Sequence, residues 1–466
     1  MILAELGEAP GEIAVIGLGK SGFAASRLLL RHGYKVYASD AGTSPQIERG
    51  VAELRAAGAA VDVGKHDLDR IAHAALVVTS PGVPPDSEAL RAARGAHVRV
   101  LSETEVGLRA LGSGSSYIAV TGTNGKTTTT AMVGHLLRTL GHDALDAGNI
   151  GVPVSEVALA GSPPAWLALE MSSFQLHDTP SIAPAVGVLT NLGPDHLDRY
   201  ESVRDYYADK ALLFRNATAA SRWVVNDADD AAVAMASRAL GRHFHFGRSR
   251  LCEMVYERSG SPLEGWLTWR GQKVMRRDEI PLLGDHNVEN AMAAALAVIV
   301  ADDRHAERSG LDRVAQGLRT FEALPHRLER VVEREGVLWI NDSKATNPGS
   351  TLVAIRAMTR PTILLLGGRH KGEPYTSLAA PLQAIGKAVI AYGEAGPIVQ
   401  SDLSNTLPVH LLGSDFGEVM SLARRLAEPG DVVLLSPACS SYDMFRNYVE
   451  RGERFRELAL EGGEAA

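Results

Sequence analysis

Short apolar runs alternate with longer stretches of helical periodicity along the whole chain, and few folds satisfy that alternation. Near the N-terminus the apolar runs fall at 12–19, 35–40, 75–80 and 98–102, and residues 21–33 have the spacing of an amphipathic helix. Runs this apolar are typical of strands buried on both faces, as in a parallel sheet with crossover helices. We therefore predict an α/β fold.

Three segments repeat this pattern. The chain has 466 residues, which exceeds one ordinary hydrophobic core. The Gly/Ser-rich stretch 111–116 is typical of a linker, and a third segment begins near residue 323. Antiparallel hairpins are expected at about 250–282. We expect three domains, at residues 1–112, 113–324 and 325–466. Further buried strands are predicted at 117–122, 165–170, 185–192, 222–227, 337–343, 361–368, 388–393 and 431–438.

Charge and cysteine content exclude several classes of protein. The 47 Lys and Arg residues are outnumbered by 55 Asp and Glu residues, which argues against a nucleic-acid binder that needs a basic face. Cys252 and Cys439 form no CxxC pattern, so neither a disulfide framework nor a zinc site is expected. The N-terminus is acidic where a signal peptide is basic, and no apolar run reaches the roughly 18 residues of a spanning helix. We expect a cytoplasmic protein without membrane insertion.

A glycine-rich loop follows the first predicted strand. Residues 17–22 read GLGKSG, and Asp40 ends the next strand. This is the dinucleotide fingerprint, in which backbone N–H groups approach a diphosphate at a helix N-terminus. The loop fits NAD and a UDP group equally well, so an NAD-dependent oxidoreductase stays an alternative at this point.

A second loop, residues 120–127 (VTGTNGKT), lies between a predicted strand and a predicted helix. It departs from the GxxxxGK[ST] pattern because its first glycine is Gly122, yet successive N–H groups can still form a nest for phosphates. Lys126 supplies a positive charge for the β- and γ-phosphates, and the Thr127 hydroxyl can ligate Mg²⁺. This loop predicts an ATP site.

Acidic side chains follow the next buried strands. Glu170 ends one strand, at the edge where parallel sheets bind ligands, and a Mg²⁺ ligand or a helix N-terminal acid would both fit there. Asp195, His196 and Asp198 follow the neighbouring strand and offer further oxygen and nitrogen ligands. Surface or packing roles stay open for each of them.

For several other polar residues, the local sequence pattern does not distinguish a functional role from a structural one. Lys210 has the pattern of a solvated helical lysine. Asn287 and Asn290 share one helix face, where they could contact adenine or cap the helix. The polar run 342–347 follows a buried strand and indicates a site, whereas Lys371 after two glycines could be a phosphate contact or a loop cation.

Taken together, the motifs resemble one known family. Six segments occur in a single order: GTNGKT, LEMSSFQL, NLGPDHLDRY, PHRLE, NDSKATNPGS and SPACSSYDMF. The chain resembles the Mur ligases over nearly its whole length, and SSFQL and SPACSS are similar to the D-glutamate-adding branch. The resemblance implies an N-terminal Rossmann-like domain for UDP, a central P-loop-type ATPase α/β domain and a C-terminal Rossmann-like domain for the amino acid.

The resemblance also implies roles for individual residues. Lys126, Lys210, His196 and Lys344 match catalytic positions. The matching ATP positions are Gly122, Thr123, Asn124, Gly125, Lys126, Thr127, Thr128, Asn149, Asn287, Asn290, Arg327 and Asp342. Two Mg²⁺ ions would lie among Thr127, Glu170, His196 and Lys210, the last after carbamylation. The UDP positions are Gly17, Gly19, Lys20, Ser21, Asp40 and Gly82. The D-glutamate positions are Thr346, Lys371, Ser441 and Tyr448.

Two positions depart from the family pattern. Tyr448 replaces a common phenylalanine, and Ala41 stands where a small hydroxyl residue is frequent. The resemblance implies a monomer that joins D-glutamate to UDP-N-acetylmuramoyl-L-alanine through an acyl phosphate and releases ADP. An ATP-driven switch and a sibling ligase with another acceptor remain alternatives.

Overall fold

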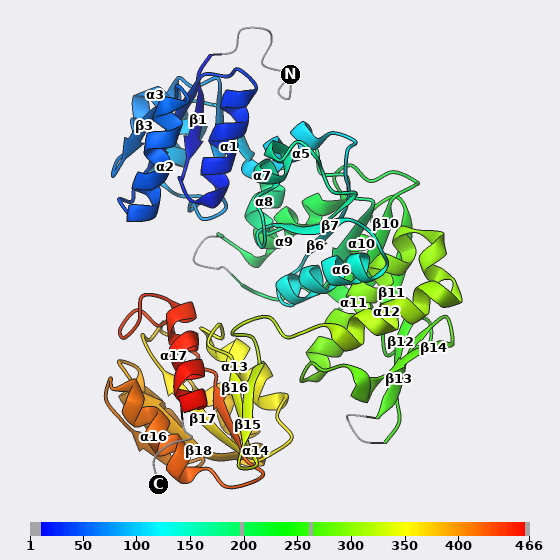
Figure 1. The fold of residues 1–466 in the computed structure, drawn as a ribbon, viewed down its shortest axis with the longest axis vertical. Coiled ribbons are helices and arrows are strands. Elements are labelled where there is room, and N and C mark those ends of the chain that lie inside the picture. Colours follow the sequence, from blue (N-terminus) through cyan, green and yellow to red (C-terminus); the bar gives the residue numbers. More distant parts are fainter. Residues whose placement is uncertain (1–10, 196–199, 261–263, 462–466) are drawn as a thin grey trace. The chain divides into compact units, whose positions relative to one another are not determined.

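The structure, a computed structural model, describes residues 11–195, 200–260 and 264–461. Within these ranges three sheets with flanking helices follow one another along the chain, coloured from blue to red in Figure 1. Every apolar run named above contains a strand, which confirms the predicted α/β fold. The chain divides into two compact units, Met1–Glu279 with Glu289–Arg319 and Ile280–Val288 with Thr320–Ala466. The domain boundaries at 112 and 324 stay predictions.

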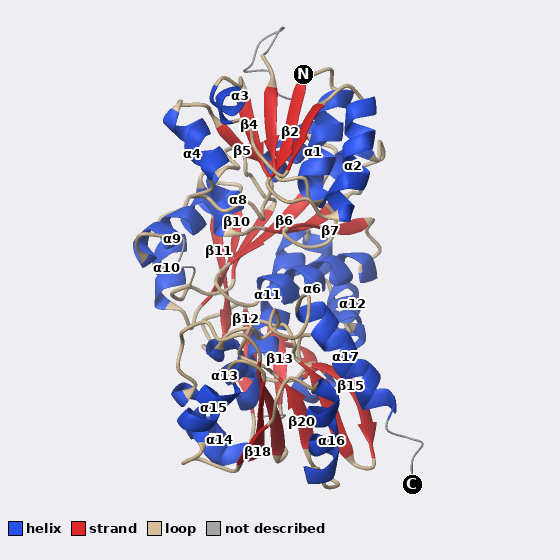
Figure 2. Ribbon diagram, turned by 90° about the vertical axis from the view of Figure 1, so that its left-hand side faces the viewer, coloured by secondary structure: helices blue, strands red, loops and turns tan. Residues whose placement is uncertain are grey.

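The first sheet is parallel throughout, with the strand order β3-β2-β1-β4-β5. Both faces of β1 are apolar: Ile13 and Val15 pack with α1, α2 and α5, whereas Ala14 and Ile16 pack with α3 and α4. Helices therefore cover both faces of this sheet (Figure 2). The elements are β1 (Ile13–Ile16), α1 (Lys20–Arg31), β2 (Val36–Asp40), α2 (Pro45–Ala56), β3 (Ala60–Val63), α3 (Leu68–Ala72), β4 (Leu76–Thr79), α4 (Glu88–Gly95), β5 (Val100–Ser102) and α5 (Glu103–Leu111).

The second sheet has the order β14-β13-β12-β11-β10-β9-β6-β8-β7. It is parallel from β7 to β12, and β12, β13 and β14 form the predicted antiparallel hairpins. Its strands are β6 (Ser116–Thr121), β7 (Ala144–Gly148), β8 (Trp166–Glu170), β9 (Val186–Leu189), β10 (Arg222–Asn226), β11 (Arg242–Gly247), β12 (Met254–Arg258), β13 (Gly265–Trp269) and β14 (Gln272–Arg276). Its helices are α6 (Lys126–Thr139), α7 (Val154–Leu159), α8 (Ser173–His177), α9 (Val203–Ala211), α10 (Asp230–Ala236), α11 (Asp285–Ala301) and α12 (Arg308–Thr320).

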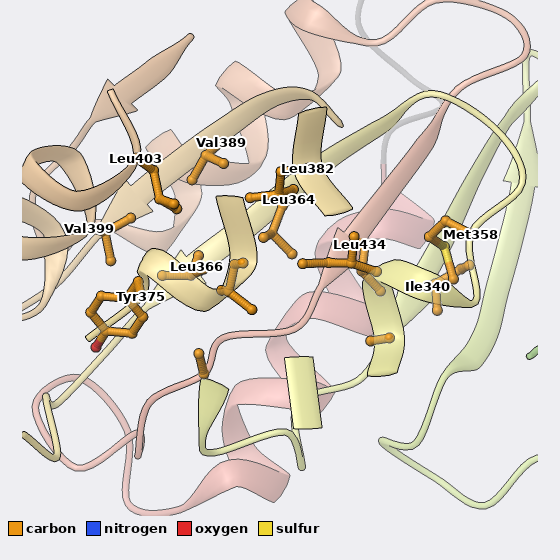
Figure 3. Close-up of a cluster of buried hydrophobic side chains, with 14 of the residues drawn as sticks. Ile340, Met358, Leu364, Leu366, Tyr375, Leu382, Val389, Val399, Leu403 and Leu434 are labelled. Atoms are coloured by element: carbon orange, nitrogen blue, oxygen red, sulfur yellow. The ribbon is translucent and has the colours of Figure 1, made fainter. Parts of the chain in front are cut away.

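The third sheet has the order β15-β16-β20-β17-β18-β19, with only the β15–β16 pair antiparallel among its described strands. Figure 3 shows the core on one face, where Leu364 and Leu366 of β17 pack with Leu382, Leu403 and Leu434. Each buried leucine contributes about 2 kcal/mol of hydrophobic free energy. The elements are β15 (Glu329–Arg334), β16 (Val337–Asn341), α13 (Pro348–Arg356), β17 (Thr362–Gly367), α14 (Ala379–Ile385), β18 (Gly386–Tyr392), α15 (Gly396–Leu403), β19 (Val409–Leu411), α16 (Phe416–Leu426), β20 (Val432–Leu435) and α17 (Tyr448–Glu461).

Candidate active site

A cavity of about 500 Å³ opens at the glycine-rich loop after β1. It is lined by all the residues predicted to bind UDP, namely Gly17, Gly19, Lys20, Ser21, Asp40 and Gly82. Asn149, which was predicted on the ATP side, lines the same cavity, as do Ala41, His66 and Ser80. The structure therefore brings the predicted UDP residues together in one cavity of the first unit.

Glycine stands at three positions of this loop for different structural reasons. Gly17 has φ +86°, a left-handed conformation that side chains disfavour. A Cβ at Gly22 would lie 1.8 Å from the Gly17 carbonyl oxygen, so only glycine lets α1 approach β1 this closely. Gly19 has open space around its Cβ position and lines the cavity, so its lack of a side chain leaves backbone N–H groups accessible.

Asp40 has a structural role that the sequence pattern did not reveal. Its Oδ2 accepts a hydrogen bond from Leu18 N at 2.6 Å, and its Oδ1 accepts one from Gly42 N at 2.7 Å. Both carboxylate oxygens therefore hold the backbone of the loops that border the cavity.

The second glycine-rich loop joins β6 to α6. Gly122 has φ +146°, and a Cβ there would lie 2.0 Å from Thr190 Oγ1. Gly125 is the N-cap of α6 with φ +82°, and a Cβ there would lie 2.3 Å from Asn290 Oδ1. Side chains are thus excluded at both positions, and the loop leads directly into a helix N-terminus, where backbone N–H groups favour phosphate.

Two lysine side chains converge on this loop. Lys126 Nζ donates hydrogen bonds to the carbonyl oxygens of Gly122 at 2.9 Å and Thr123 at 2.7 Å. Lys210 Nζ, from α9, donates to the same Gly122 oxygen at 2.6 Å. The structure therefore places Lys210 beside the predicted phosphate loop, although its sequence pattern was that of a solvated lysine.

Lys210 is only 1% exposed, and its amine lies 4.4 Å from the centre of the Tyr206 ring. Burial, and secondly the charge of Lys126, lower the pKa of the Lys210 amine to about 6, although Asp195 and Asp209 act in the opposite direction. The side chain is therefore a neutral amine at pH 7, which is the nucleophilic form of lysine.

Glu170 ends β8 with a carboxylate that is 1% exposed. Its Oε1 accepts a hydrogen bond from Asn149 Nδ2 at 2.7 Å, whereas its Oε2 is buried without a hydrogen-bond partner among the described residues. A buried, half-satisfied carboxylate is costly without a cation, so Glu170 fits a metal ligand. No group of three His, Cys, Asp or Glu side chains gathers within the described ranges, and His196 and Asp198 lie outside them.

Several predicted ATP residues lie around the loop. Thr129 Oγ1 donates to Asn290 Oδ1 at 3.3 Å, which ties α11 to the first turn of α6 next to Thr127 and Thr128. Asn191, which the sequence did not single out, accepts from Asn124 N at 2.8 Å and donates to Asn124 O at 3.0 Å. This amide pair fixes the tip of the loop. Asn287 Nδ2 donates to Leu283 O within the second unit, which ties the first turn of α11 to the segment before it.

In the second unit, Asp342 is held inside the protein. Its oxygens accept hydrogen bonds from Ser436 Oγ at 2.8 Å and from Leu328 N at 3.2 Å. Burial raises the pKa of Asp342 to about 7, although these hydrogen bonds and the charge of Arg327 oppose it. The carboxyl therefore titrates near neutral pH.

The predicted amino-acid residues gather around two loops of this unit. Lys344 Nζ lies 5.4 Å from the centre of the Tyr448 ring, and Thr346 follows on the same loop. Arg369 N donates to Ser440 O at 2.8 Å, so the exposed Lys371 and the buried Ser441 belong to adjoining segments.

One buried cation was missed by sequence reasoning. Arg451 is fully buried and donates to Ser343 Oγ, Ser343 O and Cys439 O. It thus links the loop after β16 to the loop after β20. No sequence signal distinguishes it from the exposed arginines of the same helix, such as Arg454.

Comparisons with known proteins agree with this architecture. Three family models match: the Mur ligase MurD-like N-terminal domain at 11–102, the Mur ligase middle domain at 120–298, and the Mur ligase glutamate ligase domain at 326–439. The chain is 38% identical to a UDP-N-acetylmuramoylalanine--D-glutamate ligase of Pelotomaculum thermopropionicum, over 96% of this chain and 97% of that one. It is 41% identical to the enzyme of the same name from Anaeromyxobacter dehalogenans, with the same two coverages.

Solved structures share the fold at lower identity. UDP-N-acetylmuramate-alanine ligase MurC from Thermotoga maritima superposes with a TM-score of 0.62 at 20% identity, covering 97% of this chain and 99% of that one. MurF ligase from Thermotoga maritima in complex with ADP gives a TM-score of 0.61 at 16% identity, with coverages of 91% and 94%. At these identities the likeness concerns the fold. Three α/β sheets in this order, two glycine-rich loops, and full-length relatives above 35% identity lead to one conclusion: the chain belongs to the Mur ligase family.

Proposed function

We propose that this protein uses ATP to join D-glutamate to the L-alanine carboxylate of UDP-N-acetylmuramoyl-L-alanine, as a step of peptidoglycan precursor synthesis. The observation that carries the proposal is the surroundings of the Gly122 loop, where Lys126, a neutral Lys210 and a half-satisfied Glu170 carboxylate lie close to a helix N-terminus. The relatives that match over nearly their full length carry the name of this ligase.

The chemistry follows from the weakness of a carboxylate as an electrophile. The substrate carboxylate attacks the γ-phosphorus of ATP, ADP leaves, and an acyl phosphate forms. The amine of D-glutamate then attacks the acyl carbon, and phosphate leaves from the tetrahedral intermediate as the amide forms. Lys126 and the N–H groups at the start of α6 would offset the charge that gathers on the phosphoryl oxygens.

Glu170 and Thr127 are the described residues that suit Mg²⁺, because both offer oxygen ligands next to the loop. His196 would complete the set, and two ions are expected from the family. When bound, Mg²⁺ would neutralise phosphate charge and orient the γ-phosphoryl group. Asn149 would hold Glu170 in place through its hydrogen bond to Oε1.

Lys210 is proposed to carry a carbamate. Its neutral amine would attack the carbon of CO₂, one proton would pass to solvent, and the side chain would change from neutral to a charge of −1. A carboxylate at this position would then serve as a second anionic group beside the loop. This modification requires the unprotonated amine, which burial supplies.

The cytoplasmic location and the monomeric state stay part of the proposal. Within the described ranges no helix combines the length and the apolarity that a membrane crossing requires. An NAD-dependent oxidoreductase is the weaker candidate because it would leave the Gly122 loop without a ligand. Titration with NADH, monitored by its fluorescence, would detect that activity.

The deciding experiment measures phosphate release from ATP in the presence of UDP-N-acetylmuramoyl-L-alanine with D-glutamate, L-glutamate or no amino acid. Release that depends on D-glutamate, with ADP as the nucleotide product, is expected. Dependence on another amino acid would keep the ligase and change the acceptor, whereas release that ignores every amino acid would favour an ATP-driven switch. AMP and pyrophosphate as products would contradict the acyl phosphate. The Lys126→Ala variant gives the background from contaminating ATPases.

A further inference from the structure

His66 belongs to no sequence motif, yet it lines the cavity at the first glycine-rich loop. It lies three residues after β3, beside the end of β2, where folds of this class recognise the nucleoside of a bound nucleotide. Its Nδ1 atom is 2.9 Å from the hydroxyl oxygen of Ser39, the penultimate residue of β2. The imidazole is half-buried, so one of its nitrogens faces the protein interior while the ring borders the cavity.

Hydrogen bonds behind the ring hold its surroundings in place, and the contact between His66 Nδ1 and the Ser39 hydroxyl is compatible with either tautomer. Tyr37 donates its phenolic hydrogen to Asp62 Oδ2 at 3.0 Å and accepts a bond from Asp67 N at 2.8 Å. In the tautomer that carries its hydrogen on Nδ1, His66 donates this hydrogen to the Ser39 oxygen. Nε2 then carries a lone pair and is a hydrogen-bond acceptor.

The same surroundings keep the ring neutral. Burial lowers the pKa of His66 from its ordinary value, and the carboxylates of Asp40 and Glu88 act in the opposite direction. The ring is therefore neutral at neutral pH, and in the Nδ1–H tautomer the Nε2 lone pair is available.

The neighbouring residues at this edge of the cavity and at the start of α1 are less suited to accept a hydrogen bond from a nucleoside. Both oxygens of Asp40 already accept backbone hydrogen bonds, and Ala41 has no polar side chain. Lys20 and Ser21, at the start of α1, offer donors that suit phosphate rather than a hydroxyl or an N–H group. His66 thus offers, at this edge of the cavity, a side-chain nitrogen that the loop backbone does not engage.

We propose that His66 Nε2 accepts a hydrogen bond from the nucleoside of the UDP substrate, from either a ribose hydroxyl or the N3–H group of uracil, and that His66 is a specificity-determining residue. The inference rests on the proposed function, since it requires a uridine nucleotide in this cavity. Both donors share one chemistry, and substrate analogues that lack one or the other can distinguish them. A cytosine base has no hydrogen on N3, so an acceptor facing the base would select uracil against cytosine.

The test uses the full-length protein and measures the dissociation constant of UDP by calorimetry at pH 7.5. His66→Phe keeps an aromatic ring but removes the acceptor, and about two- to tenfold weaker binding is expected for the loss of one hydrogen bond. His66→Gln can present a carbonyl oxygen and should recover part of the affinity. His73→Phe changes an exposed histidine after α3 and serves as the matched control, with unchanged binding expected.

Analogues separate recognition from a merely structural effect. The three analogues are 2′-deoxy-UDP, 3′-deoxy-UDP and 3-methyl-UDP. The analogue that lacks the hydrogen-bond donor to His66 should bind wild type and His66→Phe with equal affinity. The other two analogues should still bind wild type more tightly than His66→Phe. The role of His66 would be overturned if His66→Phe lost the same affinity for UDP and for all three analogues, or if it lost no affinity for UDP. Wild-type protein that binds no UDP would overturn the proposed function as well, which makes the two failures distinguishable.

Discussion

Lys210 shows how a single residue acquires chemistry from its surroundings. Burial of its amine, and secondly the charge of Lys126 beside it, lower the pKa of Lys210 to about 6, so the neutral form predominates at pH 7. Its position in sequence gives no hint of this, because Lys126 and Gly122, which lie beside the amine, come from another segment of the chain. Periodicity therefore predicted a solvated lysine, and only the family resemblance suggested a functional one.

The lowered pKa of Lys210 makes stability depend on pH in a defined direction. Between the folded value of about 6 and the ordinary value of 10.5, the unfolded chain binds more protons at this residue than the folded chain does. The free energy of unfolding of wild type therefore rises with pH in this window. We expect Lys210→Met to be more stable than wild type near pH 6, and this advantage to shrink by up to about 1.4 kcal/mol per pH unit above it.

Urea unfolding at pH 6, 7, 8 and 9 in CO₂-free buffer measures this difference. Lys35→Met, which changes an exposed lysine, is the control and should follow wild type at every pH. Parallel curves for wild type and Lys210→Met would show that the Lys210 amine is protonated in the folded protein. The same variant should lack ligase activity, with no recovery in added bicarbonate.

Glu170 gives a second prediction at this scale. Because its Oε2 is buried without a hydrogen bond among the described residues, we expect a cation to stabilise the folded protein through it. Glu170→Gln should lower turnover roughly 100-fold or more, since several kcal/mol of charge stabilisation would be lost. Thermal unfolding with and without MgADP gives the structural readout. MgADP should raise the melting temperature of wild type, and it should raise that of the variant by less. An equal shift would argue against metal ligation, and Glu257→Gln, at an exposed position, is the control.

At the scale of elements, the sequence was informative where one segment determines its own conformation. The buried strands, the two strand–loop–helix units and the hairpins of β12 to β14 were all predicted from local pattern. Strands β3, β7, β11, β15 and β19 were not singled out, because they are short or carry charged residues. Side chains that act through distant partners, such as His66 and Arg451, were missed for a related reason: their partners Ser39, Ser343 and Cys439 are fixed by tertiary packing.

The loop between β1 and α1 allows two glycines to be compared. A Cβ at Gly22 would meet the Gly17 carbonyl oxygen at 1.8 Å, whereas a Cβ at Gly19 would meet no atom within 4 Å. Gly22→Ala should therefore destabilise the protein by about 2 kcal/mol, a typical cost of overpacking, while Gly19→Ala should change stability by less than about 0.5 kcal/mol. Gly19→Ala should still weaken UDP binding, because its methyl group would enter the cavity. Thermal unfolding and UDP titration of both variants measure this; equal stabilities would contradict the close approach of α1 to β1.

At the scale of the whole molecule, the predicted ligand sites are divided between two compact units. The residues predicted for UDP and for the ATP phosphates lie in the first unit, and those predicted for D-glutamate lie in the second. Each unit has its own sheets and its own core, as the separate hydrophobic clusters around β1 and β17 show. Sequence alone predicted that each of the three α/β segments forms its own sheet, because each segment supplies its own buried strands. It could not predict the two units, since the first contains two sheets joined by contacts among α1, α5 and α7.

This division predicts how a substitution in one unit affects the binding of each substrate. Lys371 is exposed on a loop after β17, next to the segment of Ser441, and its proposed partner is a carboxylate of D-glutamate. Lys371→Ala should raise the KM for D-glutamate about tenfold or more, as expected for the loss of a charge-assisted hydrogen bond. The dissociation constant of UDP and the melting temperature should stay at their wild-type values, because all the residues predicted to bind UDP lie in the first unit. Lys387→Ala, which removes an ion pair with Glu428 and Asp431 in the same unit, controls for the loss of a surface lysine. Weaker UDP binding in Lys371→Ala would show instead that the loop acts on the first unit, and an unchanged KM for D-glutamate would remove Lys371 from the amino-acid site.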